Sequence, residues 1–448
     1  MKVGIDAISY YLPNIYLPIE VLAEARNIEA DKLKFGLGLQ GMSFPDQDED
    51  VISMALNAVE KLFLQEKLNP KDIHRIYVGS ESGLDSSKPI GSYIVANLEE
   101  KLGKGTLEHC DTVDLTFACI GGVDALLNCA DFIRLNPNKK AIVITTDFAK
   151  YELESTGEYT QGAGAIALLI TSNPSIIALE KSIGISTEGV FDFFKPKRYF
   201  QKLDILEDDS LEIVSENEIA IHKEQPVFDG QYSNQCYIQR IKNAYANYCK
   251  ESNSNELRFK KWEHIYMHLP YCFQGRRTFI EIYAETQPEL LKKQAGETKS
   301  EKIKNLSKSK EYKKLIDSKI YPSEIASGLV GNLYTGSVFL GMISALCHSF
   351  STNKEIIGKR VGFIAYGSGS KAKVFEGKIQ ENWHSKVKSL DLFSYLENRT
   401  KLTIKQYDAL YKKELKQPIS KEKKGYFLSK IEKENPVLIG ARYYQFDK

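Results

Sequence analysis

Residues 111–133, DTVDLTFACIGGVDALLNCADFI, form a strand-like run that leads directly into a helix-like run. Apolar residues recur at helical spacing at positions 123, 126, 127, 130 and 133, so we predict a buried helix from Gly121. Cys119 lies where the strand would meet the first turn of that helix. There the backbone N–H groups and the helix dipole favour a thiolate, the form that attacks an acyl carbon. Gly121 and Gly122 would remove side-chain bulk where a substrate approaches the backbone.

Two further residues with acid–base chemistry follow strand-like runs. Glu81 follows the run 76–80 and opens a small, polar segment, so its carboxylate can point into a cleft as a general acid or base. His268 follows the run 265–267 and precedes Pro270. Taken alone, such a cysteine is usually a core residue and such a glutamate is usually solvated. The interpretation therefore depends on the motifs around them.

Short β-branched runs alternate with helical patterns along the chain, which indicates an α/β fold. Residues 141–146 have the pattern of a fully buried strand, and residues 50–63 that of an amphipathic helix. The second half faintly repeats the first. Residues 331–337 open a helix much as residues 118–122 do, and residues 361–369 resemble residues 162–170.

The composition fits a large enzyme-like core and excludes several other classes of protein. The chain has 448 residues, of which 42% are hydrophobic, and its formal net charge of +1 argues against a broad nucleic-acid-binding surface. Its seven cysteines lack metal-ligand spacing and their number is odd, so we expect reduced thiols and no bound metal. No secretory signal and no apolar run of membrane-spanning length is evident, so we expect a soluble, cytoplasmic protein.

Six motifs occur in a fixed order and carry a family resemblance. They are Val78-Gly-Ser-Glu-Ser-Gly-Leu-Asp-Ser-Ser-Lys88, Ala118-Cys-Ile-Gly-Gly122, Gly157-Glu-Tyr-Thr-Gln-Gly-Ala-Gly164, His268-Leu-Pro-Tyr271, Gly331-Asn-Leu-Tyr-Thr-Gly-Ser337 and Tyr366-Gly-Ser-Gly369. Together they resemble the hydroxymethylglutaryl-CoA synthase family of the thiolase-like superfamily, from about Met1 to about Gly377. The resemblance implies two related halves, stacked as helix, sheet, helix, sheet and helix layers.

The resemblance also implies a division of the chain. Residues 1–170 would form the N-terminal half with Glu81 and Cys119, and residues 171–378 the C-terminal half with His268 and Asn332. Residues 201–224 and 291–319 diverge and are interpreted as surface insertions, the second of them an exposed, charged helical segment. We expect residues 379–448 to pack as a helical appendage.

The implied reaction condenses acetyl-CoA with acetoacetyl-CoA and water to give 3-hydroxy-3-methylglutaryl-CoA and CoA, in the mevalonate route to isoprenoids. Cys119 would take the acetyl group, Glu81 would remove a methyl proton from acetyl-Cys119, and His268 would bind and polarise the acetoacetyl group. Coenzyme A thioesters would be substrates, with no further cofactor. The resemblance also implies a homodimer.

Supporting roles follow residue by residue from the family motifs. Tyr151, Asn332, Gly367 and Ser368 would line the acyl pocket or bind substrate carbonyls, although core hydrogen bonding is an equal alternative for Tyr151 and Asn332. Arg276 and Arg277 replace a lysine pair of the family and could bind phosphates of coenzyme A, because guanidinium groups bind phosphate through two parallel bonds. The sequence departs from the family at Ile120, Cys272 and Phe273, any of which could reshape the pocket.

The sequence leaves three alternatives open. A ketoacyl or chalcone-type synthase would also use the cysteine, but such enzymes pair it with histidine and asparagine or a second histidine, without the segment at Glu81. A polyketide β-branching synthase uses the same three residues and takes acyl groups from carrier proteins. A catalytically inactive scaffold would not require Cys119, Glu81 and His268 together.

Overall fold

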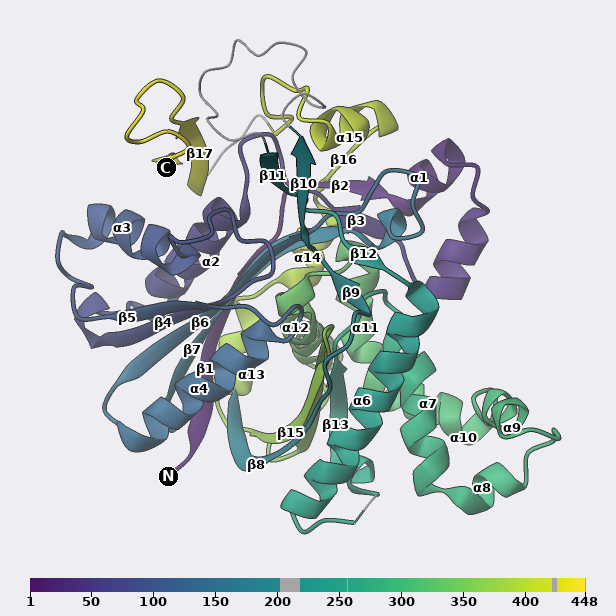
Figure 1. Ribbon diagram of the computed structural model, residues 1–448. Helices are drawn as coiled ribbons and strands as arrows, with labels where there is room; N and C mark the ends of the chain where they lie inside the picture. The colour runs from purple at the N-terminus through teal and green to yellow at the C-terminus, as the bar shows by residue number, and fades with distance from the viewer. Residues whose placement is uncertain (202–217, 256, 421–424, 448) are drawn as a thin grey trace.

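The computed structural model describes residues 1–201, 218–255, 257–420 and 425–447, and a nine-stranded mixed sheet runs through the molecule (Figure 1). The strands follow the order β13-β14-β15-β8-β1-β7-β6-β4-β5. Their bounds are β1 (Val3–Tyr11), β4 (Ile73–Gly79), β5 (Asp111–Leu115), β6 (Lys140–Ala149), β7 (Gly162–Ser172), β8 (Ile177–Thr187), β13 (Trp262–Met267), β14 (Arg360–Gly367) and β15 (Lys371–Ile379).

The two ends of this sheet have the same topology. From the middle outward, β1, β7, β6 and β4 are joined by antiparallel, antiparallel and parallel pairings, and β8, β15, β14 and β13 repeat that series. The internal repeat suggested by the sequence is therefore present in the fold. One part of the expected correspondence is wrong: the counterpart of β14 is β6, whereas residues 162–170 belong to β7, the counterpart of β15.

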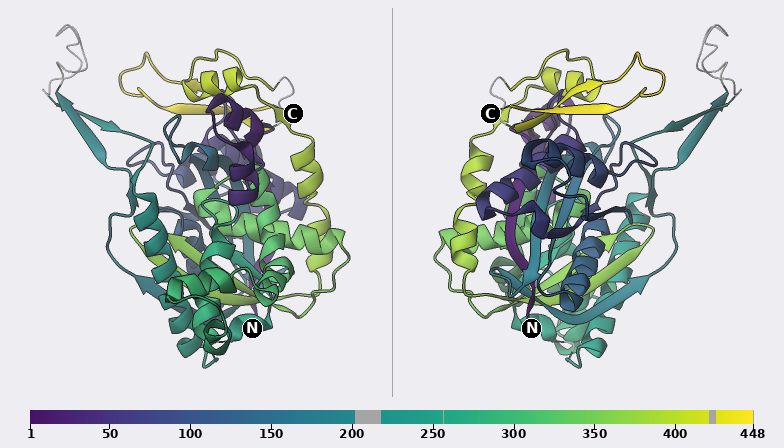
Figure 2. Two further views of the ribbon diagram at one scale, coloured as in Figure 1. Left: turned by 90° about the vertical axis from the view of Figure 1, so that its right-hand side faces the viewer. Right: turned by 90° about the vertical axis from the view of Figure 1, so that its left-hand side faces the viewer.

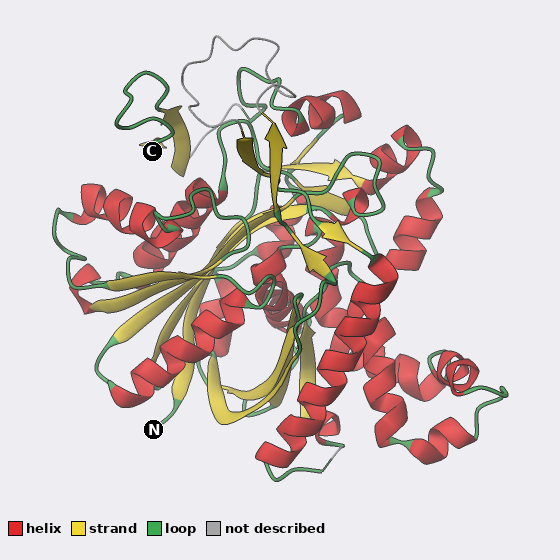
Figure 3. Cartoon of the chain, viewed as in Figure 1, coloured by secondary structure: helices red, strands yellow, loops and turns green. Residues whose placement is uncertain are grey.

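Helices cover both outer faces of the sheet and fill the space between its two halves, as the red helices and yellow strands of Figure 3 show. The outer helices pack on one half each, whereas α4 and α12 share the central hydrophobic core with residues of both halves. This gives the predicted five layers. The main helices are α2 (Val51–Glu66), α3 (Ile90–Leu102), α4 (Gly121–Leu135), α6 (Gly230–Glu251), α7 (Gln274–Thr286), α11 (Tyr321–Val330) and α12 (Ser337–Ser351).

Buried apolar side chains along the central strands alternate between the two faces of the sheet, which explains why helices must cover both faces. In β6, Ala141 and Val143 belong to the central core, and Ile142 and Ile144 to the cluster under α2 and α3. A strand that is apolar on both faces is stable only between two helical layers. The sequence pattern of residues 141–146 therefore predicted both the strand and its depth.

Local sequence also fixes where α2 begins. The side chain of Asp50 accepts hydrogen bonds from the backbone N–H groups of Ile52 and Ser53, and the Ser53 hydroxyl accepts one from the backbone of Asp50. This reciprocal cap satisfies N–H groups that lack helical partners. The helix predicted over 50–63 is confirmed, three residues longer at its end.

The divergent segments are only partly as expected. Residues 202–217 of the first segment lie outside the described residues, and the flanking strands β10 (Lys197–Gln201) and β11 (Glu218–His222) project from the body (Figure 2). The second segment is helical, as predicted. It is not merely exposed, because Leu306 and Tyr312 are buried against the outer C-terminal layer. Its helices are α8 (Pro288–Lys292), α9 (Lys299–Leu306) and α10 (Lys310–Leu315).

The C-terminal appendage is helical only in its first part. Trp383 and Leu392 of its first two helices join the central core, whereas the last described residues form a β-hairpin rather than the expected helix. Asn57 of α2 holds the hairpin by hydrogen bonds with the backbone N–H and carbonyl of Tyr426. The elements are α13 (Trp383–Lys388), α14 (Leu392–Glu397), β16 (Thr400–Lys401), α15 (Ile404–Tyr411), β17 (Gly425–Ile431) and β18 (Arg442–Asp447).

Short elements complete the described chain. A small sheet joins β16 to β2 and β3, a two-stranded ribbon pairs β9 with β12, and the remaining helix, α1, follows β2. No helix within the described ranges combines the length and the apolar character needed to cross a membrane. The bounds of the short elements are β2 (Ile15–Pro18), α1 (Ile19–Ala25), β3 (Gly41–Ser43), β9 (Phe193–Phe194) and β12 (Val227–Phe228).

Candidate active site

The three predicted catalytic residues lie at the carboxyl ends of parallel strands. Glu81 follows β4, Cys119 lies between β5 and α4, and β4 and β5 run parallel. His268 directly follows β13, which runs parallel to β14. Because β13 is the topological counterpart of β4, Glu81 and His268 occupy matching strand ends in the two halves. The internal repeat thus places an acid and an imidazole at equivalent strand ends, although they lie far apart in sequence.

A strained turn presents the Cys119 thiol. Ala118 has a φ of 41°, in the left-handed region that residues with a side chain rarely adopt. Such strain persists where the surrounding structure holds it, and it is typical of functional sites. Tyr334, which also lines the site, has a φ of 45°.

The glycines after Cys119 do not serve substrate approach, which corrects the sequence interpretation. A Cβ on Gly121 would lie 2.4 Å from the Leu115 carbonyl oxygen, and one on Gly122 would lie 2.4 Å from the Thr145 Cγ2. Both positions are filled by protein atoms. The glycines instead allow the start of α4 to lie directly on the ends of the neighbouring strands.

Cys119, Glu81 and Lys195 form a buried row of side chains. The Cys119 Sγ donates to Glu81 Oε1 at 3.8 Å, and the Lys195 Nζ lies 3.9 Å from the same oxygen. Lys195 also lies 3.4 Å from the backbone carbonyl oxygen of Glu81. Asp147, at the end of β6, accepts the backbone N–H of Glu81 through its Oδ1 at 2.9 Å. The second Asp147 oxygen accepts the backbone N–H of Thr335 at 3.0 Å.

Burial changes the protonation of this row. It raises the pKa of Glu81 to about 7, where Asp147 adds to the rise and Lys195 opposes it. Burial also raises the pKa of Cys119 well above its usual range, together with the charges of Glu81 and Asp147. The thiolate expected from the helix position is therefore not the resting form. Cys119 rests as a thiol, and its proton has an acceptor in Glu81.

His268 is a neutral imidazole. Burial lowers its pKa to about 3, so that it carries no charge at neutral pH. Its Nδ1 is buried and has no hydrogen-bond partner among the described residues. The rings of Tyr237 and Tyr366 lie beside it, with centroids 6.3 and 6.5 Å away. The backbone is held by a hydrogen bond of 2.6 Å from the Tyr237 hydroxyl to the His268 carbonyl.

Cys119 and His268 open into one cavity of about 720 Å³. Tyr151, Asn332 and Ser368 line it as well, which brings most of the predicted acyl pocket together. The Asn332 side chain also has a structural role, because its Oδ1 accepts the backbone N–H of Tyr334 at 2.8 Å. Gly367 does not line the cavity: a Cβ there would lie 2.6 Å from the Phe117 carbonyl oxygen, so this glycine packs against the nucleophile turn.

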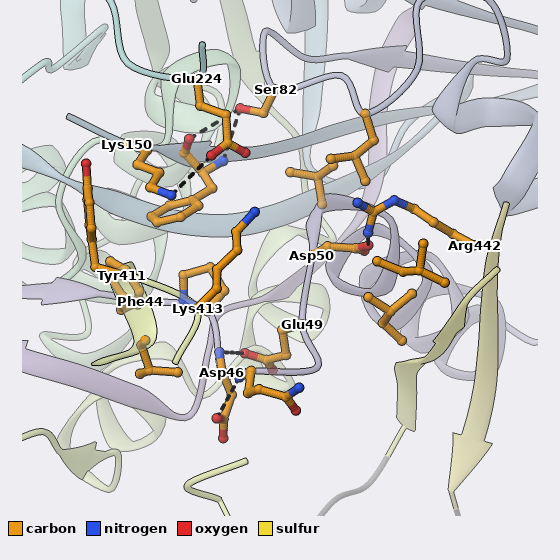
Figure 4. Close-up of a pocket in the computed structure, with 18 of the residues that line it drawn as sticks. Phe44, Asp46, Glu49, Asp50, Ser82, Lys150, Glu224, Tyr411, Lys413 and Arg442 are labelled. Atoms are coloured by element: carbon orange, nitrogen blue, oxygen red, sulfur yellow. Dashed lines mark hydrogen bonds and ion pairs between the residues drawn. The ribbon is translucent and has the colours of Figure 1, made fainter. Parts of the chain in front are cut away.

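Glu81 faces a second cavity of about 510 Å³ on the other side of the row. Lys195, Ser82 and Lys150 line it together with residues of the C-terminal appendage. Figure 4 shows Lys150 directed at Glu224, Arg442 directed at Asp50 and Lys413 pointing into the space. The sequence predicted neither this cavity nor the contacts that Lys195 and Asp147 make with Glu81. Lys195 lies in the motif Phe193-Phe-Lys-Pro196, which borders the first divergent segment.

The two arginines predicted to bind phosphate differ in availability. Arg276 is held by Glu324, a buried carboxylate, with Nε 2.9 Å from Oε1, and its guanidinium lies 3.8 Å from the centre of the Phe273 ring. This pairing argues against Arg276 as a phosphate ligand. Arg277 is exposed, and its guanidinium lies 5.8 Å from the ring of Tyr271, which lines the Cys119 cavity.

The residues that depart from the family pattern do not line the acyl end of the cavity. Ile120 is fully buried in the central core and is not among the residues that line the cavity. Cys272 is buried and its Sγ donates to the Glu324 carbonyl oxygen at 3.3 Å. The described residues include all seven cysteines and contain no disulfide, and they hold no cluster of three or more side chains suited to a metal ion.

Comparison with known proteins agrees with this geometry. Residues 1–175 match the family described as "Hydroxymethylglutaryl-coenzyme A synthase N terminal", and residues 219–434 match its "C terminal" counterpart. A hydroxymethylglutaryl-CoA synthase of Enterococcus faecalis is 30% identical over 411 residues, which is 92% of each chain.

Solved structures agree as well. "MvaS in complex with 3-hydroxy-3-methylglutaryl coenzyme A" superposes with a TM-score of 0.82 at 26% identity, covering 100% of this chain and 99% of that one. The HMG synthase of the curacin biosynthetic pathway shares the fold with a TM-score of 0.78 at 21% identity, covering 100% of both chains. Two family matches that together span most of the sequence, and a relative of nearly equal length, lead to one conclusion: this chain belongs to the hydroxymethylglutaryl-CoA synthase family, with its thiolase-like fold.

Proposed function

We propose that this protein condenses acetyl-CoA with acetoacetyl-CoA and water, giving 3-hydroxy-3-methylglutaryl-CoA and CoA. The observation that carries the proposal is the Cys119 thiol within 3.8 Å of the Glu81 carboxyl group, beside a cavity that His268 also lines. Membership of the family, and a neighbour solved with 3-hydroxy-3-methylglutaryl coenzyme A, support coenzyme A thioesters as substrates. The reaction would supply the mevalonate route to isoprenoids.

The first step is acetyl transfer to Cys119. The thiol gives its proton to Glu81 as sulfur attacks the acetyl carbonyl carbon, and the carbon–sulfur bond to CoA breaks. The CoA thiolate takes that proton from Glu81 and leaves as its thiol, so that Glu81 is ionised again. Glu81 can accept this proton because its pKa of about 7 leaves much of it ionised at neutral pH. Backbone N–H groups of Cys119 and Ser368 are candidate donors to the carbonyl oxygen, which gains negative charge.

The second step forms the carbon–carbon bond. Ionised Glu81 removes a proton from the methyl group of acetyl-Cys119, and the resulting carbanion adds to the ketone carbon of acetoacetyl-CoA. The neutral His268 imidazole donates a hydrogen bond to the ketone oxygen, which becomes an alkoxide and takes up the proton that Glu81 removed, so that Glu81 is ionised again. Water then cleaves the thioester to Cys119, and this step restores the thiol.

Two further parts of the proposal concern binding and assembly. Arg277, which is exposed and lies next to Tyr271 of the Cys119 cavity, would contact a phosphate of coenzyme A. A homodimer would form across β5, which is the last strand of the sheet and pairs only with β4 within the described chain. The buried strand β6 lies between β4 and β7, so neither of its edges is open to another chain.

The test uses the purified protein with radioactive acetyl-CoA and, separately, with both substrates. We expect covalent label on the wild type and none on Cys119→Ala, and loss of acetoacetyl-CoA only with the wild type. Cys272→Ala is a matched control, because Cys272 is also buried but lies outside the catalytic row. Retained labelling of Cys119→Ala would contradict the mechanism. Labelling only by an acetylated carrier protein would instead favour a polyketide β-branching function.

A further inference from the structure

Lys195 is a buried cation placed against the catalytic carboxylate, and the proposed reaction gives it no step. Its side chain is only 12% exposed. Its Nζ lies 3.9 Å from Glu81 Oε1, 3.4 Å from the Glu81 backbone oxygen and 4.6 Å from the centre of the Tyr334 ring. These three contacts fix the ammonium group at one side of Glu81.

The geometry joins Lys195 to the chemistry through a single atom. The same Oε1 that receives the Cys119 Sγ–H is the oxygen that faces Lys195. Lys195 lines the cavity on the Glu81 side and not the cavity that holds Cys119 and His268. Lys195 therefore contacts Glu81 from the side of the second cavity and occupies no space that the acyl groups need.

Burial and the neighbouring Asp147 oppose the ionised form of Glu81. The hydrogen bond from the Cys119 thiol favours the carboxylate, but that proton is the one that leaves in the reaction. The other charged residues of the second cavity are mostly paired with one another, as Lys150 is with Glu224 at 3.1 Å. Among the described residues, Lys195 is the cation that contacts Glu81.

We propose that Lys195 is a positioning residue that keeps Glu81 ionised and its Oε1 directed at Cys119, so that Glu81 serves as a base near neutral pH. This deepens the proposed function and rests on it. A carboxylate buried with a second acid beside it would otherwise hold its proton, and an opposite charge within about 4–6 Å favours the ionised form. Lys195 thereby allows a dry site to contain an active base.

The first measurement does not depend on catalysis. The infrared carbonyl band of protonated Glu81 is identified by its absence in Glu81→Gln, and its intensity is followed with pH. We expect the midpoint to rise by about one pH unit or more in Lys195→Met, which keeps side-chain bulk and removes the charge. Lys195→Arg should restore the midpoint. Lys150→Met is the matched control, because it removes another buried cation that lines the same cavity, and its midpoint should equal that of the wild type.

The second measurement is the pH profile of condensation. Activity should rise with pH as Glu81 ionises, and this limb should move to higher pH in Lys195→Met. A rise of the Glu81 pKa by one unit from about 7 costs about fivefold in activity at pH 7. Acetylation of Cys119 should persist in the variant, with its pH dependence moved upward in the same way, because ionised Glu81 also accepts the thiol proton in that step. An infrared midpoint that is unchanged in Lys195→Met overturns the inference even if the wild type condenses its substrates. A shifted midpoint in a protein without condensation activity overturns the proposed function instead.

Discussion

Glu81 carries two opposite effects within one side chain. As a carboxylate it raises the pKa of Cys119, yet it also accepts the hydrogen bond of the Cys119 thiol and is the proposed acceptor of its proton. A pKa of about 7 reconciles the two roles, because Glu81 can gain and lose a proton at neutral pH with little free-energy cost.

Glu81→Ala should therefore separate the half-reactions. We expect acetyl-Cys119 to form still, although more slowly: the acceptor of the thiol proton is lost, and with it a charge that raises the pKa of the thiol. Condensation should fall by roughly a hundredfold to ten-thousandfold, as is typical when a general base is removed. Single-turnover measurements of acetyl-enzyme and of product decide the matter, and full condensation activity would exclude Glu81 as the base.

His268 should act on the second substrate. We predict that His268→Ala weakens acetoacetyl-CoA binding more than it slows acetylation of Cys119, because the two ends of the site arise from different halves of the fold. His268→Asn keeps an N–H donor and should lose less. The readout is the dissociation constant for acetoacetyl-CoA beside the acetylation rate. Equal losses in both would make His268 a partner of the thiol.

At the scale of elements, close backbone contacts set the height of Cys119 above the sheet. Gly79, at the end of β4, packs directly against the start of α4. A Cβ on Gly79 would lie 2.3 Å from the backbone nitrogen of Gly122. Neither backbone can move without shifting the strained turn that carries Cys119.

Gly79→Ala should therefore damage stability and acetylation together. We expect a loss of about 1–3 kcal/mol in the free energy of unfolding, the usual range for overpacking, and at least a tenfold lower acetylation rate. Gly189→Ala is the control, because no atom lies within 4 Å of its added Cβ. Denaturant titration and acetyl labelling measure the two effects. Normal labelling in a stable Gly79→Ala protein would refute this account.

At the scale of the whole molecule, the sheet ends in an open edge. β5 pairs with β4 on one side, and Val113 in its middle is 37% exposed. An exposed strand edge is a template for pairing with another chain, and a lysine there opposes it.

We expect the wild type to be a dimer at micromolar concentration, and Val113→Lys to shift it toward monomer with reduced activity. Val437→Lys is the control, since Val437 is also an exposed apolar residue but lies in the C-terminal hairpin. Light scattering measures the mass of each variant. A fully active wild-type monomer would contradict the dimer.

Much of this architecture was predictable because its determinants are local. Apolar periodicity located α2, α4 and β6, and the strand ends at Glu81, Cys119 and His268 followed from short patterns. The C-terminal hairpin was missed because Asn57, far away in sequence, holds it against α2.

The sequence by itself determined the fold class, the family and the three candidate catalytic side chains, because periodicity and short motifs can be recognised within the chain. Only the tertiary structure decided how those groups ionise and which residues lie next to them. Burial keeps Cys119 a thiol and His268 a neutral imidazole. Arg276 forms an ion pair with Glu324, and Lys195 contacts Glu81. Desolvation and ion pairing depend on distances between residues remote in sequence, and residue spacing does not encode those distances.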